Sequence, residues 1–240
     1  MPMLQPAVPE ESPWHDKIEF QVGRSKFKGY LAVPEGGDVP GVLVIHAWWG
    51  LTDFFKEVCD RLASDGFVAL APDLYNGKTA STIDEAKRLR SKAKSVVVQK
   101  ELNGAVDLLS TLFAVSGKRI GVLGFSLGAY WSMWLATKRP SEVAAVTVFY
   151  GTRGGNYRKA RAAFLGHLAE RDEYEPEKSV REVEAQLRFA GREVAFHVYP
   201  RTGHWFFEED RADAYNPEAA NLAWERTTQF FHKNLDQQTG

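Results

Sequence analysis

Short runs of apolar residues alternate with longer segments of helical periodicity over most of this 240-residue chain. Several runs are continuously apolar, such as GVLVIH at 41–46, which is typical of strands buried on both faces. The alternation predicts the α/β class, with a mainly parallel central sheet and helices on both faces. The expected strands are 41–46, 67–71, 119–123, 144–150, 161–165 and 194–199, and the expected helices are 54–64, 84–113 with a break near 95, 127–137, 177–190 and 217–235.

The start of the chain has a different pattern. Residues 18–22 and 26–33 flank the turn Gly23-Arg24-Ser25, which predicts an antiparallel hairpin. A chain of this length is long for a minimal domain and short for two. We therefore expect an N-terminal extension over 1–16 and a single domain over 17–240, with no lid domain inserted between the strands.

Charge and composition exclude several classes of partner. Thirty basic and 31 acidic residues give a net charge of -1, so the chain has no overall positive field to attract nucleic acid. No apolar run approaches the roughly 18 residues of a membrane span, and the N-terminus does not resemble a signal peptide. Nothing resembles a metal-ligand cluster or a phosphate-binding glycine loop. We expect a cytoplasmic protein without cofactor or metal, monomeric or weakly dimeric.

The stretch Gly124-Phe125-Ser126-Leu127-Gly128 falls between a predicted strand and a predicted helix. A G-x-S-x-G pattern at such a junction is typical of a nucleophile elbow, a strained turn that presents the serine above the sheet. Side chains two positions before and after the serine would collide with the neighbouring strand and helix. The alternative is a glycine-rich turn with a passive serine.

A serine hydroxyl is a weak nucleophile at neutral pH, so the elbow requires a base. His204 follows the last predicted strand, which places it at the carboxyl edge of the sheet, the same side as the elbow. The alternative for His204 is a packed, hydrogen-bonded side chain. The other histidines lie in the extension, in or beside strands, or on the last helix: His15, His46, His167, His197 and His232.

The base in turn needs a carboxylate that orients it. The chain order Ser-acid-His places this acid between 126 and 204, after a strand. Asp172 is the best candidate because it lies after the predicted strand 161–165 and before the next helix. Three neighbouring carboxylates stay open as alternatives: Glu170, Glu173 and Glu175.

Six segments together resemble the dienelactone hydrolase family of α/β-hydrolases, over about residues 17–236. These segments are GVLVIHAWWGL, VALAPDLY, GVLGFSLGA, RDEYEP, YPRTGHWFF and AYNPEAANLAWERTTQFF. The resemblance implies the α/β-hydrolase fold, with Asp172 and His204 at the positions of the family's catalytic acid and base. It also implies an oxyanion hole formed by the backbone N–H groups of Trp48 and Leu127.

The chain departs from the dienelactone hydrolases proper at three positions. They use a cysteine nucleophile where this chain has Ser126, and the only cysteine here, Cys59, is better interpreted as a small buried hydrophobe. They carry a glutamate on the oxyanion loop, where this chain has Ala47. They also place an arginine shortly after the histidine, where this chain has the acidic stretch 207–210, which we expect to be a solvated loop.

The expected activity is hydrolysis of carboxylic ester or lactone bonds of small substrates through Ser126, His204 and Asp172, with an acyl-enzyme intermediate. Three alternatives remain: an acyltransferase, an amide hydrolase on the same site, or a non-catalytic binding protein that retains the fold. A haloalkane dehalogenase would need an aspartate at position 126. Aromatic residues near the carboxyl edge favour an apolar or aromatic ester. The expected substrate contacts are Trp49, Phe125, Tyr150 and Trp205.

Overall fold

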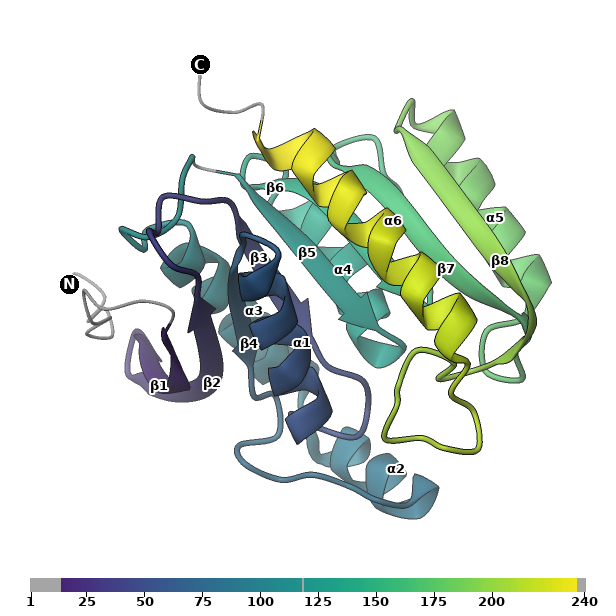
Figure 1. Cartoon of the computed structure of the whole chain (residues 1–240), viewed down its shortest axis with the longest axis horizontal. Helices are drawn as coiled ribbons and strands as arrows, with labels where there is room; N and C mark the ends of the chain where they lie inside the picture. The colour runs from purple at the N-terminus through teal and green to yellow at the C-terminus, as the bar shows by residue number, and fades with distance from the viewer. Residues whose placement is uncertain (1–13, 118, 237–240) are drawn as a thin grey trace. The chain divides into compact units, whose positions relative to one another are not determined.

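The computed structural model of the chain describes residues 14–117 and 119–236 (Figure 1). These residues form two compact units, the first ending at Ile120 and the second beginning at Gly121. The described strands are β1 (Trp14–Val22), β2 (Ser25–Val33), β3 (Gly41–Ile45), β4 (Val68–Pro72), β5 (Ile120–Phe125), β6 (Val143–Phe149), β7 (Ala163–Arg171) and β8 (Val194–Gly203). The described helices are α1 (Asp53–Ser64), α2 (Ile83–Lys92), α3 (Ser95–Leu109), α4 (Leu127–Lys138), α5 (Glu177–Phe189) and α6 (Pro217–Leu235).

In the first unit the strands lie in the order β1-β2-β4-β3. The hairpin predicted at the start of the chain is confirmed, because β1 and β2 pair antiparallel from Trp14↔Val33 to Val22↔Ser25. β2 also pairs antiparallel with β4, whereas β3 and β4 are parallel. Every residue of β3 and β4 is buried, as their continuously apolar sequences predict, and α1 and α3 cover opposite faces of these strands (Figure 1).

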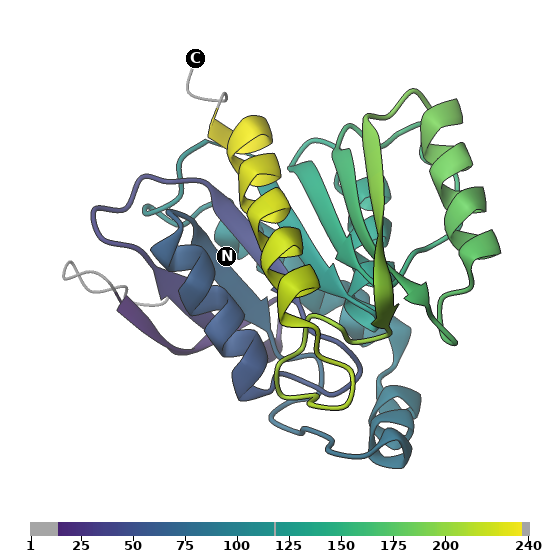
Figure 2. The same cartoon turned by 45° about the vertical axis from the view of Figure 1, so that its right-hand side comes forward.

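In the second unit the strands lie in the order β5-β6-β7-β8, and β7 pairs parallel with both β6 and β8. Every residue of β5 and β6 is buried, which is the pattern of strands covered on both faces. Helix α6 covers one face of this unit, and α4 and α5 cover the other (Figure 2). The carboxyl ends of β5, β7 and β8 lead into the candidate site residues described below.

The α/β class and the alternation of strands and helices are confirmed. The segment 84–113 contains two helices, with the expected break between Lys92 and Ser95. The strand expected over 161–165 is shifted and longer, so that His167, expected beyond it, lies inside β7. Residues 14–16, assigned to the extension, belong to β1, and residues 1–13 lie outside the described part.

Among the described residues, no additional lid domain interrupts the strands. In the same part of the chain, none of the helices is long and apolar enough to cross a lipid bilayer. The division into a single domain and an extension stays a prediction, as do the cytoplasmic location and the oligomeric state.

Candidate active site

Ser126 occupies a strained turn between β5 and α4. Its φ is 51° and its ψ is −109°, a backbone conformation that residues other than glycine rarely adopt. The turn is held on one side by the Ser126 N–H, which donates to the carbonyl of Phe149 over 2.9 Å. A Cβ atom at Gly124 would lie 2.4 Å from the carbonyl oxygen of Gly128, so the first glycine of the motif is required by close packing.

His204 bridges Ser126 and Asp172 within the second unit. Its Nε2 lies 2.9 Å from Ser126 Oγ, and its Nδ1 lies 2.8 Å from each carboxylate oxygen of Asp172. Because a carboxylate only accepts hydrogen bonds, the imidazole carries its proton on Nδ1 and donates it to Asp172. Nε2 is then free to accept the serine proton, which is the arrangement of a nucleophile, a base and an orienting acid.

Asp172 is fixed by the backbone around it. One of its carboxylate oxygens, Oδ1, accepts from the N–H of Tyr174 over 2.9 Å and from the N–H of Glu175 over 3.0 Å. Its side chain is 3% exposed and that of His204 is 5% exposed. Because the pair is buried, water does not compete for the hydrogen bond between His204 and Asp172. The carboxylate is therefore held in one orientation toward the imidazole.

The alternative acids have other contacts. Glu170 accepts the N–H of Arg201 over 2.9 Å, and Glu173 is exposed. Glu175 binds Thr152 twice, accepting from its N–H over 2.9 Å and from its hydroxyl over 2.7 Å. Glu175, which the sequence leaves open as an alternative acid, therefore has partners other than His204. Its bonds instead join the loop after β7 to the loop after β6.

Two other buried histidines have structural contacts. In the first unit, His46 accepts the N–H of Leu74 over 3.2 Å and donates to the carbonyl of Ala47 over 2.6 Å. In the second unit, His167 binds the hydroxyls of Tyr199 and Thr227 over 2.9 and 3.0 Å. Burial lowers the pKa of both imidazoles, so both are neutral core residues at neutral pH.

The aromatic residues expected to contact substrate are distributed between the two units. Trp48 and Trp49 are buried in the first unit, in an edge-to-face pair with ring centroids 5.4 Å apart. In the second unit, Phe125 and Tyr150 have no exposed surface, so neither offers surface to a ligand. Trp205 is half-buried, and its ring centroid lies 4.9 Å from that of His204.

Leu127 is the first residue of α4. The first N–H groups of a helix have no acceptor within the helix, so its N–H is available to a group bound beside Ser126. The oxyanion role of Leu127 and Trp48, and the substrate contact expected of Trp49, stay predictions.

The acidic stretch after His204 is not the solvated loop expected from its composition. Phe207 and Glu208 are buried, and only Glu209 and Asp210 are exposed. The Glu208 side chain accepts a hydrogen bond from the Tyr150 hydroxyl over 2.6 Å. A tyrosine 58 residues earlier in the chain supplies this partner, so no local pattern could have identified it. Cys59, by contrast, is fully buried as expected, and burial raises the pKa of its thiol.

A cavity of about 420 Å³ lies beside His204 in the second unit. Its volume falls in the range of small-molecule sites. Charged and polar groups line much of it, which differs from the apolar surroundings expected from sequence. Its described lining residues are Arg171, Glu173, Arg201, Gly203, His204, Trp205, Asp213, Ala214, Tyr215 and Asn216.

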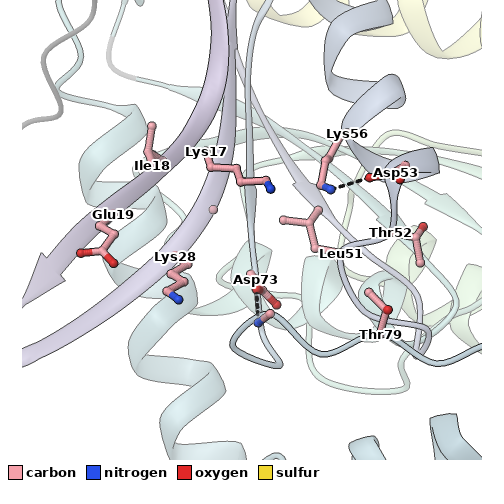
Figure 3. Close-up of a pocket in the computed structure, with 12 residues that line it drawn as sticks. Lys17, Ile18, Glu19, Lys28, Leu51, Thr52, Asp53, Lys56, Asp73 and Thr79 are labelled. Atoms are coloured by element: carbon pink, nitrogen blue, oxygen red, sulfur yellow. Dashed lines mark hydrogen bonds and ion pairs between the residues drawn. The ribbon is translucent and has the colours of Figure 1, made fainter.

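A second cavity, of about 590 Å³, lies in the first unit between β1, β2 and the start of α1 (Figure 3). Lys56 is paired with Asp53 over 2.5 Å, and the Asp73 carboxylate accepts the N–H of Gly77. None of its described lining residues is a serine, cysteine or histidine, so the cavity offers no comparable nucleophile or base. Nor do the described residues contain a cluster of three or more side chains suited to hold a metal ion.

A serine in a strained strand-to-helix turn, followed along the chain by an aspartate and then a histidine after later strands, is the arrangement of an α/β-hydrolase. Ser126 follows β5, Asp172 follows β7 and His204 follows β8. The order of the elements and the contacts of the three side chains are thus both those of the α/β-hydrolase class.

Comparison with known proteins identifies the family. Residues 27–235 match the sequence model of the dienelactone hydrolase family. The chain is 36% identical over 227 residues to the protein usf of Aquifex pyrophilus, covering 91% of this chain and 98% of that protein. It is 33% identical over 227 residues, covering 91% of this chain and 98% of the relative, to an Aquifex aeolicus protein provisionally named a carboxymethylenebutenolidase.

A solved structure of a provisionally named dienelactone hydrolase from Klebsiella pneumoniae has a TM-score of 0.80 and 24% identity, covering 92% of this chain and 99% of that one. The chain belongs to the dienelactone hydrolase family and has the α/β-hydrolase fold. Membership in this family supports a hydrolase that acts on ester or lactone bonds.

Proposed function

We propose that the protein is a serine hydrolase of carboxylic esters or lactones with small, water-soluble substrates. The observation that carries the proposal is the continuous series of hydrogen bonds from Ser126 through His204 to Asp172. A hydrolase of this kind needs a hydroxyl, a base and a carboxylate in contact with one another, and each of the three has a backbone or side-chain partner that fixes it.

The reaction proceeds in two halves. His204 Nε2 takes the proton of Ser126 as Oγ attacks the substrate carbonyl, and the same proton then passes to the leaving alcohol oxygen. Asp172 stabilises the imidazolium formed in between, and the Leu127 N–H stabilises the oxyanion. Water then attacks the acyl-enzyme, with His204 acting as base again, and releases the acid and the free serine.

The half-buried ring of Trp205 beside His204 is the aromatic surface that we assign to substrate contact. The cavity bordered by His204 and Trp205 also contains Arg171 and Arg201, which can face polar parts of a substrate.

Labelling with a fluorophosphonate tests the proposal. We expect an adduct on Ser126, identified by mass spectrometry of the modified peptide, and loss of p-nitrophenyl acetate hydrolysis in Ser126→Ala. Ser141→Ala, at an exposed serine of the same unit, is the matched control and retains activity. No adduct on Ser126, or undiminished hydrolysis by Ser126→Ala, would overturn the assignment. Added alcohols or amines as acceptors distinguish hydrolysis from acyl transfer.

A further inference from the structure

A buried hydrogen bond joins the end of β6 to the loop that carries His204. The Tyr150 hydroxyl donates to Glu208 Oε1 over 2.6 Å, and both residues are completely buried. Tyr150 directly follows β6, and Glu208 lies four residues after His204. Neither side chain is used in the proton transfers proposed above. A fully buried polar pair beside a reactive group nevertheless needs an explanation.

The backbone of Tyr150 is strained. Its φ of 37° is unusual and unfavourable for a bulky residue, so it persists only where surrounding contacts impose it. The Tyr150 N–H donates to the carbonyl of His167 over 2.8 Å. In this conformation the centroid of the tyrosine ring lies 5.0 Å from that of the His204 ring. The strained backbone thus places the ring against the imidazole.

The Tyr150–Glu208 hydrogen bond is part of a second connection between Ser126 and His204, beside their direct contact. On one side, the Ser126 N–H donates to the carbonyl immediately before Tyr150 over 2.9 Å. On the other, the Glu208 N–H donates to the carbonyl of Trp205 over 2.9 Å and closes the turn after His204. The serine and the histidine are therefore joined twice, directly and through the buried pair.

We propose that Tyr150 and Glu208 are positioning residues, whose hydrogen bond holds the His204 imidazole within reach of Ser126 Oγ. The inference rests on the catalytic function proposed above for Ser126 and His204. Displacement of a catalytic group by about 1 Å can lower a rate about 100-fold. Because neither Tyr150 nor Glu208 has exposed surface, loss of their bond lowers kcat and leaves KM nearly unchanged.

Three variants separate the bond from the packing around it. Tyr150→Phe keeps the ring and removes the donor, Glu208→Met keeps the approximate volume and removes the acceptor, and Glu208→Gln keeps an acceptor. With p-nitrophenyl acetate we expect kcat to fall about 10- to 100-fold in the first two, with KM within about 3-fold. Glu208→Gln is expected to stay within about 3-fold of the wild-type kcat.

Tyr199→Phe is the matched control. It also removes a buried tyrosine hydroxyl in the second unit, one that binds His167 over 2.9 Å and not the His204 loop. Its Tm falls, whereas its kcat is expected to remain unchanged. In the double variant Tyr150→Phe/Glu208→Met, kcat is expected to be no more than about 3-fold below that of either single variant, because both remove the same bond.

The inference is overturned if Tyr150→Phe retains the wild-type kcat, if Tyr199→Phe loses activity equally, or if the two single effects multiply in the double variant. A Glu208→Gln variant as impaired as Glu208→Met would also overturn it, because the carboxylate and not the bond would then be required. If Glu208→Met does not fold, Tyr150→Phe and Glu208→Gln decide. Ser126→Ala tests the proposed function separately: its retained activity overturns that function, whereas full activity in Tyr150→Phe overturns only the positioning role.

Discussion

His204 differs from the other two buried histidines in what its ring nitrogens contact. The nitrogens of His46 bind backbone groups, and those of His167 bind two core hydroxyls. His204 instead has a partly exposed serine hydroxyl on one nitrogen and a buried carboxylate on the other. In the proposed reaction, this placement lets one imidazole accept a proton from Ser126 while Asp172 compensates the resulting charge.

Replacing Asp172 by Asn tests the role of the carboxylate. An amide can donate a hydrogen to Nδ1, which favours the tautomer with its proton on Nε2 and removes the acceptor that Ser126 needs. We expect kcat for p-nitrophenyl acetate to fall by up to about 10⁴-fold with little change in Tm. Glu182→Gln, at an exposed carboxylate of α5, is the matched control. Similar rates for the two variants would contradict the role assigned to Asp172.

At the scale of elements, the turn between β5 and α4 depends on the absence of a side chain at Gly124. A Cβ there would lie 2.2 Å from Ser132 Oγ and 2.4 Å from the carbonyl oxygen of Gly128, so the first turn of α4 would have to move. Movement of α4 relative to β5 would displace Ser126, which lies between them.

We therefore expect Gly124→Ala to lower the free energy of unfolding by about 1–3 kcal/mol and to slow fluorophosphonate labelling of Ser126. Urea titration and the labelling rate measure the two effects. The control is Gly154→Ala, where the nearest atom to the added Cβ is 3.8 Å away. Equal stability of the two variants would show that α4 can shift at no cost.

Helix α3 carries a buried carboxyl group that the proposed reaction does not use. Glu101 is 3% exposed, and burial, with a smaller effect of the nearby Asp73, raises the pKa of its carboxyl to about 9. The unfolded chain releases this proton near pH 4.5, whereas the folded chain keeps it up to about pH 9. The stability of the folded state therefore falls as pH rises through this interval.

Glu101→Gln removes the titratable carboxyl group and is expected to stabilise the protein by about 1–3 kcal/mol at pH 7. The gain grows between pH 5 and pH 9 and disappears below about pH 4.5. Urea titrations of both proteins across this range measure it. Glu57→Gln, at an exposed glutamate of α1, is the control and is expected to change stability by less than about 0.5 kcal/mol. A gain independent of pH would contradict the raised pKa.

At the scale of the whole molecule, each compact unit contains a buried neutral histidine, His46 in the first and His167 in the second. Burial lowers the pKa of each in the folded state, so below about pH 6.5 the unfolded chain binds protons that the folded chain does not. Below about pH 6.5 the free energy of unfolding therefore falls with decreasing pH, by up to about 1.4 kcal/mol per pH unit for each histidine.

His167→Gln removes one of these contributions while leaving polar groups beside Tyr199 and Thr227. Between pH 6.5 and pH 5 we expect the free energy of unfolding of this variant to change less steeply than that of the wild type, by about 1.4 kcal/mol per pH unit. Chemical denaturation at several pH values gives both slopes. Equal slopes would show that His167 is protonated in the folded protein.

The sequence was informative where a feature depends on neighbouring residues. Continuous apolar runs predicted the buried strands, and Pro217 marked the start of α6, whose bounds are those expected. Ser126, Asp172 and His204 were predicted as a set because each follows a strand, and the structure brings their side chains into contact. The burial of Glu208 was not predictable. The acidic composition of its stretch suggested exposure to solvent, and its hydrogen-bond partner lies 58 residues earlier in the chain. The burial of Phe125 and Tyr150 likewise depends on long-range packing.

The position of helix α6 at the end of the chain has a consequence for folding during synthesis. It packs against β6 and β7, its Thr227 binds His167, and Phe231 lies close to Gly121 at the start of β5. Ser126, Asp172 and His204 all leave the ribosome before this helix does. A nascent chain stalled before residue 217 would therefore contain all three residues with one apolar face of the second unit still uncovered, and it would lack the completed core that holds them in contact.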